Sequence, residues 1–190
     1  MTQKRIVLGS KSPRRQELLA GIGIEFTIRT NDTDESYPED LNPLDVPIYI
    51  AKNKANALIE DLDVNEIIIC ADTVVIVDKT ILGKPNNEKE AKEMLQLLSG
   101  KTHLVTTGVV IGSSTKKTSF ATTTEVTFKD LTLEEIEYYV SNYSPFDKAG
   151  GYGIQEWIGF IGVTSIKGSY FNVVGLPIHE VYQQLNDFEL

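Results

Sequence analysis

The sequence predicts a mixed α/β protein built around one extended sheet with flanking helices and an active-site cleft. In the first half of the chain, apolar runs typical of strands alternate with segments of helical periodicity. Longer extended stretches dominate afterwards, which indicates antiparallel strands. The 190 residues, 41% of them hydrophobic, can bury one core but are short for two independent domains. We therefore expect a single domain over residues 1–190, with room for a bilobed shape.

The N-terminal elements follow from local patterns. Residues 6–8 form an apolar run that predicts a first strand. Ser12 and Pro13 predict a helix start, because serine can cap a helix and proline suits the first helical position. The remaining expected elements are a strand at 25–29, an acidic loop at 31–43, a helix at 47–62, and strands at 66–71 and 73–77.

The C-terminal elements begin with a turn at 78–79, a short strand at 81–82 and a helix at 88–98. Residues 103–111 and 118–129 should form two long strands joined by a hairpin loop at 112–115. Thr132 and Glu135 have the spacing of a capping box that opens a helix. We expect glycine-rich strand and loop from there to Gly175, and a final helix that begins near Pro177.

Composition excludes several classes of protein. The formal net charge of -9 opposes general binding to nucleic acids. Cys70 is the only cysteine and lies in an apolar run, so we interpret it as a core residue. His103 and His179 are the only histidines, and their spacing does not support a metal site. We see neither a signal peptide nor a membrane span, and we expect a soluble cytoplasmic protein.

A cluster of hydroxyls and cations joins the first strand to the first helix. It contains Ser10, Ser12, Arg14 and Arg15. Free backbone N–H groups and the helix dipole favour an anion at such a position, so we interpret the cluster as a phosphate site. The alternative is a capped helix with solvated basic residues.

Further polar clusters follow along the chain. We place Asp72 at the end of an apolar strand, where open α/β sheets bind their ligands, and Thr73 follows it. A carboxylate there is costly unless it is paired or bound to metal. The other clusters are Gly83-Lys84-Pro85, the glycine-rich segment 147–155 that ends in Gln155, and the segment 168–177.

Taken together and in this order, these clusters resemble the Maf family of nucleotide pyrophosphatases. The matching segments, which also include residues 99–108, span almost the whole chain. The resemblance implies a fold related to the inosine triphosphate pyrophosphatases and hydrolysis between the α- and β-phosphates of a nucleoside triphosphate. Asp72 matches the proposed catalytic acid of the family. Arg14, Thr73 and Gln155 match the specificity positions of the subgroup that acts on dTTP and UTP, whereas a sister subgroup acts on methylated GTP.

The chemistry of the residues agrees with this reaction. Cationic side chains could neutralise the triphosphate: Arg14, Arg15, Lys52, Lys54 and Lys84. A divalent cation, Mg²⁺ or Mn²⁺, would take oxygen ligands, for which Asp72 and Glu35 are the candidates. Asp72 either acts as the general base or ligates the metal, which would then activate the water, and the sequence leaves both roles open.

The base contacts also have a physical rationale. Thymine and uracil present an N–H donor between two carbonyl acceptors. Gln155 and Thr73 can both donate and accept hydrogen bonds, whereas Arg14 can only donate. Cytosine reverses part of this pattern and would leave buried polar groups unpaired.

Two other functions remain open at this point. The chain could bind nucleotide as a regulator of cell division or septum formation without significant catalysis, or it could bind nucleic acid, which its charge opposes. We expect a nucleoside triphosphate as substrate and a homodimer as the assembly.

Overall fold

The computed structural model, which describes residues 4–188, has a mixed α/β fold. Its sheet has the strand order β2-β1-β3-β5-β6-β7, and β4 pairs with β3. The pairs β1–β2 and β1–β3 are parallel, whereas β3–β4 and β6–β7 are antiparallel, so the predicted mixed sheet with flanking helices is confirmed. The strands are β1 (Arg5–Leu8), β2 (Phe26–Ile28), β3 (Glu66–Val77), β4 (Thr80–Leu82), β5 (Thr102–Gly112), β6 (Lys117–Phe128) and β7 (Val163–Lys167).

The chain divides into two compact units. The first unit comprises Met1–Asp72, Thr107–Thr122 and Gly175–Leu190, and the second comprises Thr73–Thr106 and Thr123–Val174. Strands β3, β5 and β6 contribute residues to both units.

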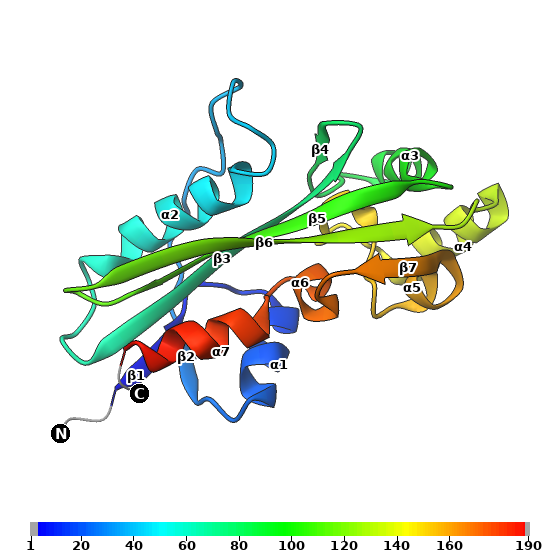
Figure 1. Ribbon diagram of the computed structural model, residues 1–190. Helices are drawn as coiled ribbons and strands as arrows, with labels where there is room; N and C mark the ends of the chain where they lie inside the picture. Colours follow the sequence, from blue (N-terminus) through cyan, green and yellow to red (C-terminus); the bar gives the residue numbers. More distant parts are fainter. Residues whose placement is uncertain (1–3, 189–190) are drawn as a thin grey trace. The chain divides into compact units, whose positions relative to one another are not determined.

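The first unit has three layers (Figure 1), and its strands β1, β3 and β5 contribute buried side chains to both faces of the sheet. Helices α1 (Pro13–Gly21) and α7 (Ile178–Asn186) pack on one face, and α2 (Val46–Ile59) packs on the other. Alternate strand residues face opposite helices, because side chains of a strand point to opposite sides of the sheet. Residues 67, 69 and 71 of β3 therefore belong to the α1/α7 cluster, and residues 68 and 70 belong to the α2 cluster.

A close backbone contact positions α2. A Cβ atom added to Gly108 of β5 would lie 2.3 Å from the backbone nitrogen of Ile48, near the start of α2. Any side chain at position 108 would therefore push the helix away from the sheet. The glycine lets the first turn of α2 lie directly on the strand.

Cys70 lies inside this first unit and is fully buried against α2. Burial raises the pKa of its thiol to about 12. The interpretation of Cys70 as a core residue is confirmed.

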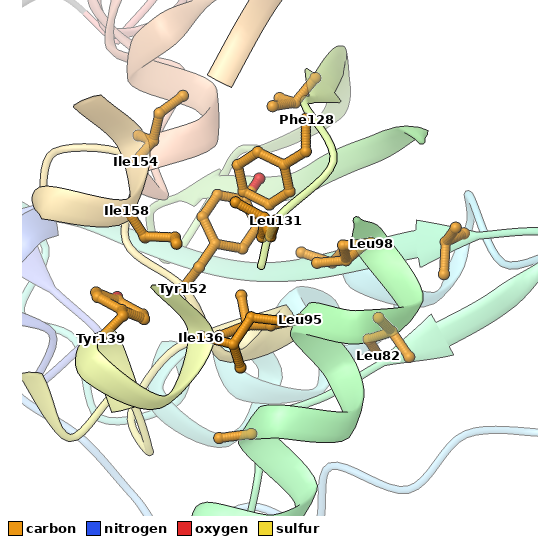
Figure 2. Packing of buried hydrophobic residues seen from close by; sticks show 14 of the residues in the cluster. Leu82, Leu95, Leu98, Phe128, Leu131, Ile136, Tyr139, Tyr152, Ile154 and Ile158 are labelled. Carbon is orange, nitrogen blue, oxygen red and sulfur yellow. The ribbon is translucent and has the colours of Figure 1, made fainter. Parts of the chain in front are cut away.

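The second unit has its own core beneath α3 (Glu88–Leu98) and α4 (Leu133–Tyr143). Figure 2 shows Leu95 and Leu98 of α3 close to Ile136 of α4, with the aromatic rings of Tyr152 and Phe128 in the same cluster. The capping box that opens α4 is confirmed: the backbone N–H of Glu135 donates to Thr132 Oγ1, and the N–H of Thr132 donates to Glu135 Oε2.

Three expectations about local structure are wrong. First, β3 runs without a break from Glu66 to Val77, so Asp72 lies inside a strand and not at its end. Second, the segment between α4 and Gly175 contains short helices as well as β7, because glycine-rich sequence masked their periodicity. Third, α1 begins at Pro13 with Ser12 at its N-cap position, as predicted, but the Ser12 side chain makes no cap hydrogen bond. The short helices are η1 (Ala149–Gly151), α5 (Trp157–Gly162) and α6 (Tyr170–Val174).

No helix within residues 4–188 combines the length and the apolar composition that crossing a membrane requires.

His103 is a buried polar residue of the second unit. Its Nε2 lies 2.7 Å from the hydroxyl of Tyr152, and its ring packs against Phe128 with the centroids 5.3 Å apart. Burial lowers the pKa of His103 from 6.5 to about 4, because a charged imidazolium is poorly solvated there.

We predict that this histidine destabilises the protein in mild acid. Between pH 6.5 and about 4 the unfolded chain binds a proton at His103 and the native chain does not, so the free energy of unfolding falls as the pH falls. The full effect is about 3 kcal/mol, and it is absent above pH 6.5, where His103 is neutral in both states. Urea unfolding at a series of pH values measures it. The variant His103→Gln should show a shallower pH dependence, and an unchanged slope would contradict the assignment.

Candidate active site

Asp72 is a buried carboxylate in the middle of β3, with 8% of its surface exposed. Most of this strand is apolar and buried, so a charge within it needs a partner. Lys54 of α2 supplies it, with Nζ 2.7 Å from Asp72 Oδ1. Both side chains are largely buried, so their attraction is screened less than on the surface and the loss of either partner would leave the other charge uncompensated.

Glu35 also forms an ion pair with Lys54. Its Oε1 lies 2.7 Å from Lys54 Nζ, and it belongs to the acidic loop that precedes α2. A local turn shapes this loop: the N–H and hydroxyl of Ser36 both donate to the carboxylate of Asp34. The loop and the strand thus bring two carboxylates to one positive charge.

This donor set fits a hard divalent cation in part. Two carboxylates that converge on one ammonium can also converge on a metal ion, and Mg²⁺ is commonly held by one or two carboxylates together with substrate phosphates. Among residues 4–188, no group of three or more His, Cys, Asp or Glu side chains is placed to hold a metal ion. A cation bound by Glu35 and Asp72 would take its remaining ligands from other oxygen groups, such as water or substrate phosphates.

Arg15 holds the backbone around Asp72. Its Nη1 donates to the carbonyl of Ala71 at 2.8 Å and to Ser10 Oγ at 3.3 Å, and its Nε donates to the carbonyl of Gly175 at 2.8 Å. Burial lowers the pKa of this guanidinium, and the nearby charge of Asp72 opposes that shift. Arg15 therefore connects the start of α1, the middle of β3 and the segment before α7.

Ser10, Ser12 and Arg14 surround the start of α1. The N–H of Ser12 donates to Ser10 Oγ at 3.2 Å, and Arg14 lies half-buried in the first turn of the helix. The first turn contains no acidic residue. The first unit thus gathers hydroxyls and cations at a helix N-terminus beside the strand that carries Asp72, which suits an anionic ligand.

The second unit brings the segments of Lys84 and Gln155 together. The N–H of Gly150 donates to the carbonyl of Gly83 at 2.9 Å. Gly150 has a φ of 69°, and a Cβ atom there would lie 3.0 Å from the Val75 side chain, so only glycine packs easily on β3. This places the glycine-rich loop next to the exposed Lys84.

Gln155 has a polar atom that its own unit does not satisfy. Its Oε1 is buried and has no hydrogen-bond partner among the described residues. A buried amide group without a partner costs free energy, and a ligand could supply the missing bond. The amide can turn over and present either its oxygen or its nitrogen.

The predicted residues therefore fall into two sets. The first unit brings Asp72 together with Ser10, Arg15, Lys54 and Glu35. Thr73, which is half-buried, Lys84 and Gln155 belong to the second unit, and Lys52 is exposed on α2.

Two side chains that the sequence does not reveal as functional, those of Tyr139 and Glu156, support the loop of Gln155. The Tyr139 hydroxyl donates to Glu156 Oε2, and Glu156 Oε1 also pairs with Lys148 Nζ at 3.1 Å. In the sequence, Tyr139 occupies an ordinary buried position of α4, so no local pattern marks it as a functional residue. A third buried group, the amide of Asn172, donates to the Val105 carbonyl and anchors α6 to β5.

Residues 5–188 match the family of Maf-like proteins. The chain is 52% identical to a dTTP/UTP pyrophosphatase of Phocaeicola vulgatus over 182 residues, which cover 95% of this chain and 94% of that protein. It is 50% identical to a dTTP/UTP pyrophosphatase of Porphyromonas gingivalis over 190 residues, which cover 97% and 94% of the two chains.

Two solved structures have a similar backbone at low sequence identity. The Ham1 protein of Staphylococcus aureus has a TM-score of 0.47 and 13% identity, over 67% of this chain and 73% of that one. The nucleoside-triphosphatase / dITP/XTP pyrophosphatase of Mycobacterium abscessus has a TM-score of 0.43 and 11% identity, over 97% of each chain.

We predict that Arg15→Lys lowers the free energy of unfolding by about 2 kcal/mol. An ammonium keeps the charge but cannot reach the carbonyls of Ala71 and Gly175 together, so a buried acceptor loses its donor. Urea unfolding measures the change. The control is Arg5→Lys, whose side chain is 55% exposed, and it should change stability by less than about 0.5 kcal/mol. Equal effects of the two substitutions would contradict this role of Arg15.

Proposed function

The chain belongs to the Maf family, and we propose that it hydrolyses dTTP and UTP to the nucleoside monophosphate and pyrophosphate. The observation that supports the reaction most is the buried Asp72 carboxylate, which pairs with Lys54, while Arg15 from the first turn of α1 donates to the carbonyl of the preceding residue, Ala71. The relatives named dTTP/UTP pyrophosphatase align over nearly the whole length of the chain.

Asp72 is our candidate for the group that receives a proton from the attacking water. Lys54 fixes the orientation of its carboxylate through Oδ1. The water oxygen would bond to the α-phosphorus while the bond from that phosphorus to the bridging oxygen breaks. Pyrophosphate leaves with the bonding electrons. A side chain within hydrogen-bond reach of the water is what general base catalysis requires.

The start of α1 would bind phosphate oxygens. Ser10, Ser12 and Arg14 offer donors there, and the helix N-terminus adds a favourable dipole. Lys84 in the second unit adds a further exposed cation. Arg15 contributes charge, but its bonds to backbone carbonyls also make it a support for the surrounding chain.

Glu35 and Asp72 are the residues that would hold a divalent cation. Bound there, the cation would offset the negative charge of the triphosphate and of the departing pyrophosphate. Lys54 already places a positive charge between the two carboxylates. When a cation binds, Lys54 either moves away or stays paired with only one of the two.

The buried amide of Gln155 supports recognition of the base. Thymine and uracil offer an N–H beside carbonyl oxygens, and an amide can pair with both kinds of group. Cytosine would leave that amide partly unpaired, which is the kind of mismatch that gives strong discrimination. Thr73 and Arg14 are the other proposed specificity residues. The homodimer and the cytoplasmic location expected from the sequence stay predictions.

We predict that the protein releases pyrophosphate from dTTP and UTP in the presence of Mg²⁺ or Mn²⁺. The measurement is pyrophosphate release from a panel of nucleoside triphosphates that includes CTP and a methylated GTP. Excess chelator should stop the release, and added Mg²⁺ or Mn²⁺ should restore it.

Release of pyrophosphate from the methylated GTP alone would support the proposed reaction but contradict the proposed preference for dTTP and UTP. Stoichiometric binding without release would instead favour the regulator. Equal kcat/KM for dTTP and CTP would contradict the contacts proposed for Gln155.

We predict that Asp72→Asn lowers kcat by at least about a hundredfold, because an amide cannot accept the proton of the attacking water. Steady-state kinetics with dTTP measure it, and circular dichroism verifies the fold. The matched control is Asp78→Asn, which removes an exposed carboxylate from the turn after β3 and should leave kcat unchanged. Near-normal turnover of Asp72→Asn would remove Asp72 from the mechanism.

A further inference from the structure

Gln155 lies in a tight turn of the second unit that is closed at both ends. The backbone N–H of Glu156 donates to the carbonyl of Gly153 at 3.0 Å, so residues 153–156 form one turn. The N–H of Gly153 donates to the hydroxyl of Tyr139 at 2.9 Å. The first residue of the turn is therefore tied to α4.

The last residue of the turn is tied to the same hydroxyl. Tyr139 donates its own proton to Glu156 Oε2, while Glu156 Oε1 pairs with Lys148. Lys148 Nζ also lies 2.7 Å from Asp147 Oδ1, and only 9% of its side chain is exposed. A single phenol thus holds both ends of the turn, and a buried lysine holds the carboxylate in place.

Close packing leaves this arrangement little freedom. A Cβ atom at Gly153 would lie 2.8 Å from Glu156 Cδ and 3.1 Å from Lys148 Cε. The carboxylate therefore lies directly over the glycine backbone. The phenol ring stacks on Tyr143 with centroids 5.1 Å apart, and Figure 2 shows it in the core beside Ile136 and Ile158.

The hydroxyl of Tyr139 stays protonated, so it can always donate a hydrogen bond. Burial and the hydrogen bond to Glu156 raise the pKa of Tyr139, so the phenol keeps its proton. The hydroxyl oxygen accepts a hydrogen bond from the backbone N–H of Gly153, and the hydroxyl proton is donated to the carboxylate of Glu156.

The turn holds the Gln155 side chain, one of whose polar atoms lacks a hydrogen-bond partner among the described residues. Gln155 is the third of the four residues, and this atom is its buried Oε1. Ordering a glutamine side chain costs conformational entropy, and leaving its amide unpaired costs more. The turn holds Gln155 in place despite both of these free-energy costs. This is the arrangement expected of a side chain that is pre-organised to bind a ligand.

We propose that Tyr139, Glu156 and Lys148 form a clamp that positions Gln155 and so sets the discrimination between pyrimidine bases. The inference rests on the proposed function, because it concerns the residue that we assign to base recognition there. The three are positioning residues: they act through Gln155 and do not contact the substrate.

The experiment compares the ratio of kcat/KM for dTTP to that for CTP in matched variants. Tyr139→Phe removes only the hydroxyl and keeps the ring that fills the core. We expect the ratio to fall about tenfold, mainly through a higher KM for dTTP. Tyr138→Phe removes a hydroxyl from the adjacent, exposed position of α4 and should leave the ratio unchanged.

A conservative variant separates positioning from general stability. Glu156→Gln can still accept the proton of Tyr139 and should keep most of the discrimination, whereas Glu156→Ala should lose as much as Tyr139→Phe. A purely structural role would lower kcat/KM for both nucleotides together and leave their ratio intact. That result would overturn the proposal.

A double-mutant cycle tests whether the clamp acts through Gln155. In the Gln155→Ala background, Tyr139→Phe should cause no further loss of discrimination, and an undiminished loss would overturn the proposal. The amide resonance of Gly153 reports the clamp directly, and it should shift in Tyr139→Phe but not in Tyr138→Phe. If the wild-type protein shows no preference for dTTP, the proposed base assignment fails first. If the preference exists and Tyr139→Phe retains it, this inference alone fails.

Discussion

The structure depends on a carboxylate placed inside a strand that is buried on both faces. Such a strand is held by apolar contacts to helices on either side, and a charge within it is tolerated only with a partner. Lys54 can be that partner because α2 lies directly on the sheet, and α2 can lie there because Gly108 has no side chain. One glycine, one helix and one lysine therefore give the Asp72 carboxylate its partner.

The second constraint is that backbone groups, and not only side chains, organise both polar clusters. Arg15 bonds to two carbonyls from distant parts of the first unit, and the N–H of Gly150 bonds to the carbonyl before Lys84 in the second. Backbone partners fix position more firmly than exposed side chains do, because the main chain carries the fold. Residues that could simply neutralise phosphate are thereby also part of the scaffold.

The sequence predicted well what short-range patterns determine. The apolar run at 66–71 and the extended stretch at 103–111 become largely buried strands, and the Thr132–Glu135 spacing becomes a capping box. It failed where local signals conflict. Asp72 looks like a strand end because it is polar, yet pairing with α2 lets the strand continue. The ordered set of clusters indicated the family, whereas Tyr139 and Glu156 stayed hidden, because their hydrogen bond joins residues that only the fold brings together.

The single cysteine has a consequence for chemical damage. Oxidants attack the thiolate and need access to the sulfur, and Cys70 has neither property, since it is fully buried with a pKa of about 12. A Cβ atom added to Gly9 would lie 2.3 Å from its Sγ, so the sulfur packs directly on the backbone that follows β1 and has no room on that side for an added oxygen atom. Peroxides and disulfides that inactivate enzymes through an accessible thiol therefore find no reactive thiol in this protein.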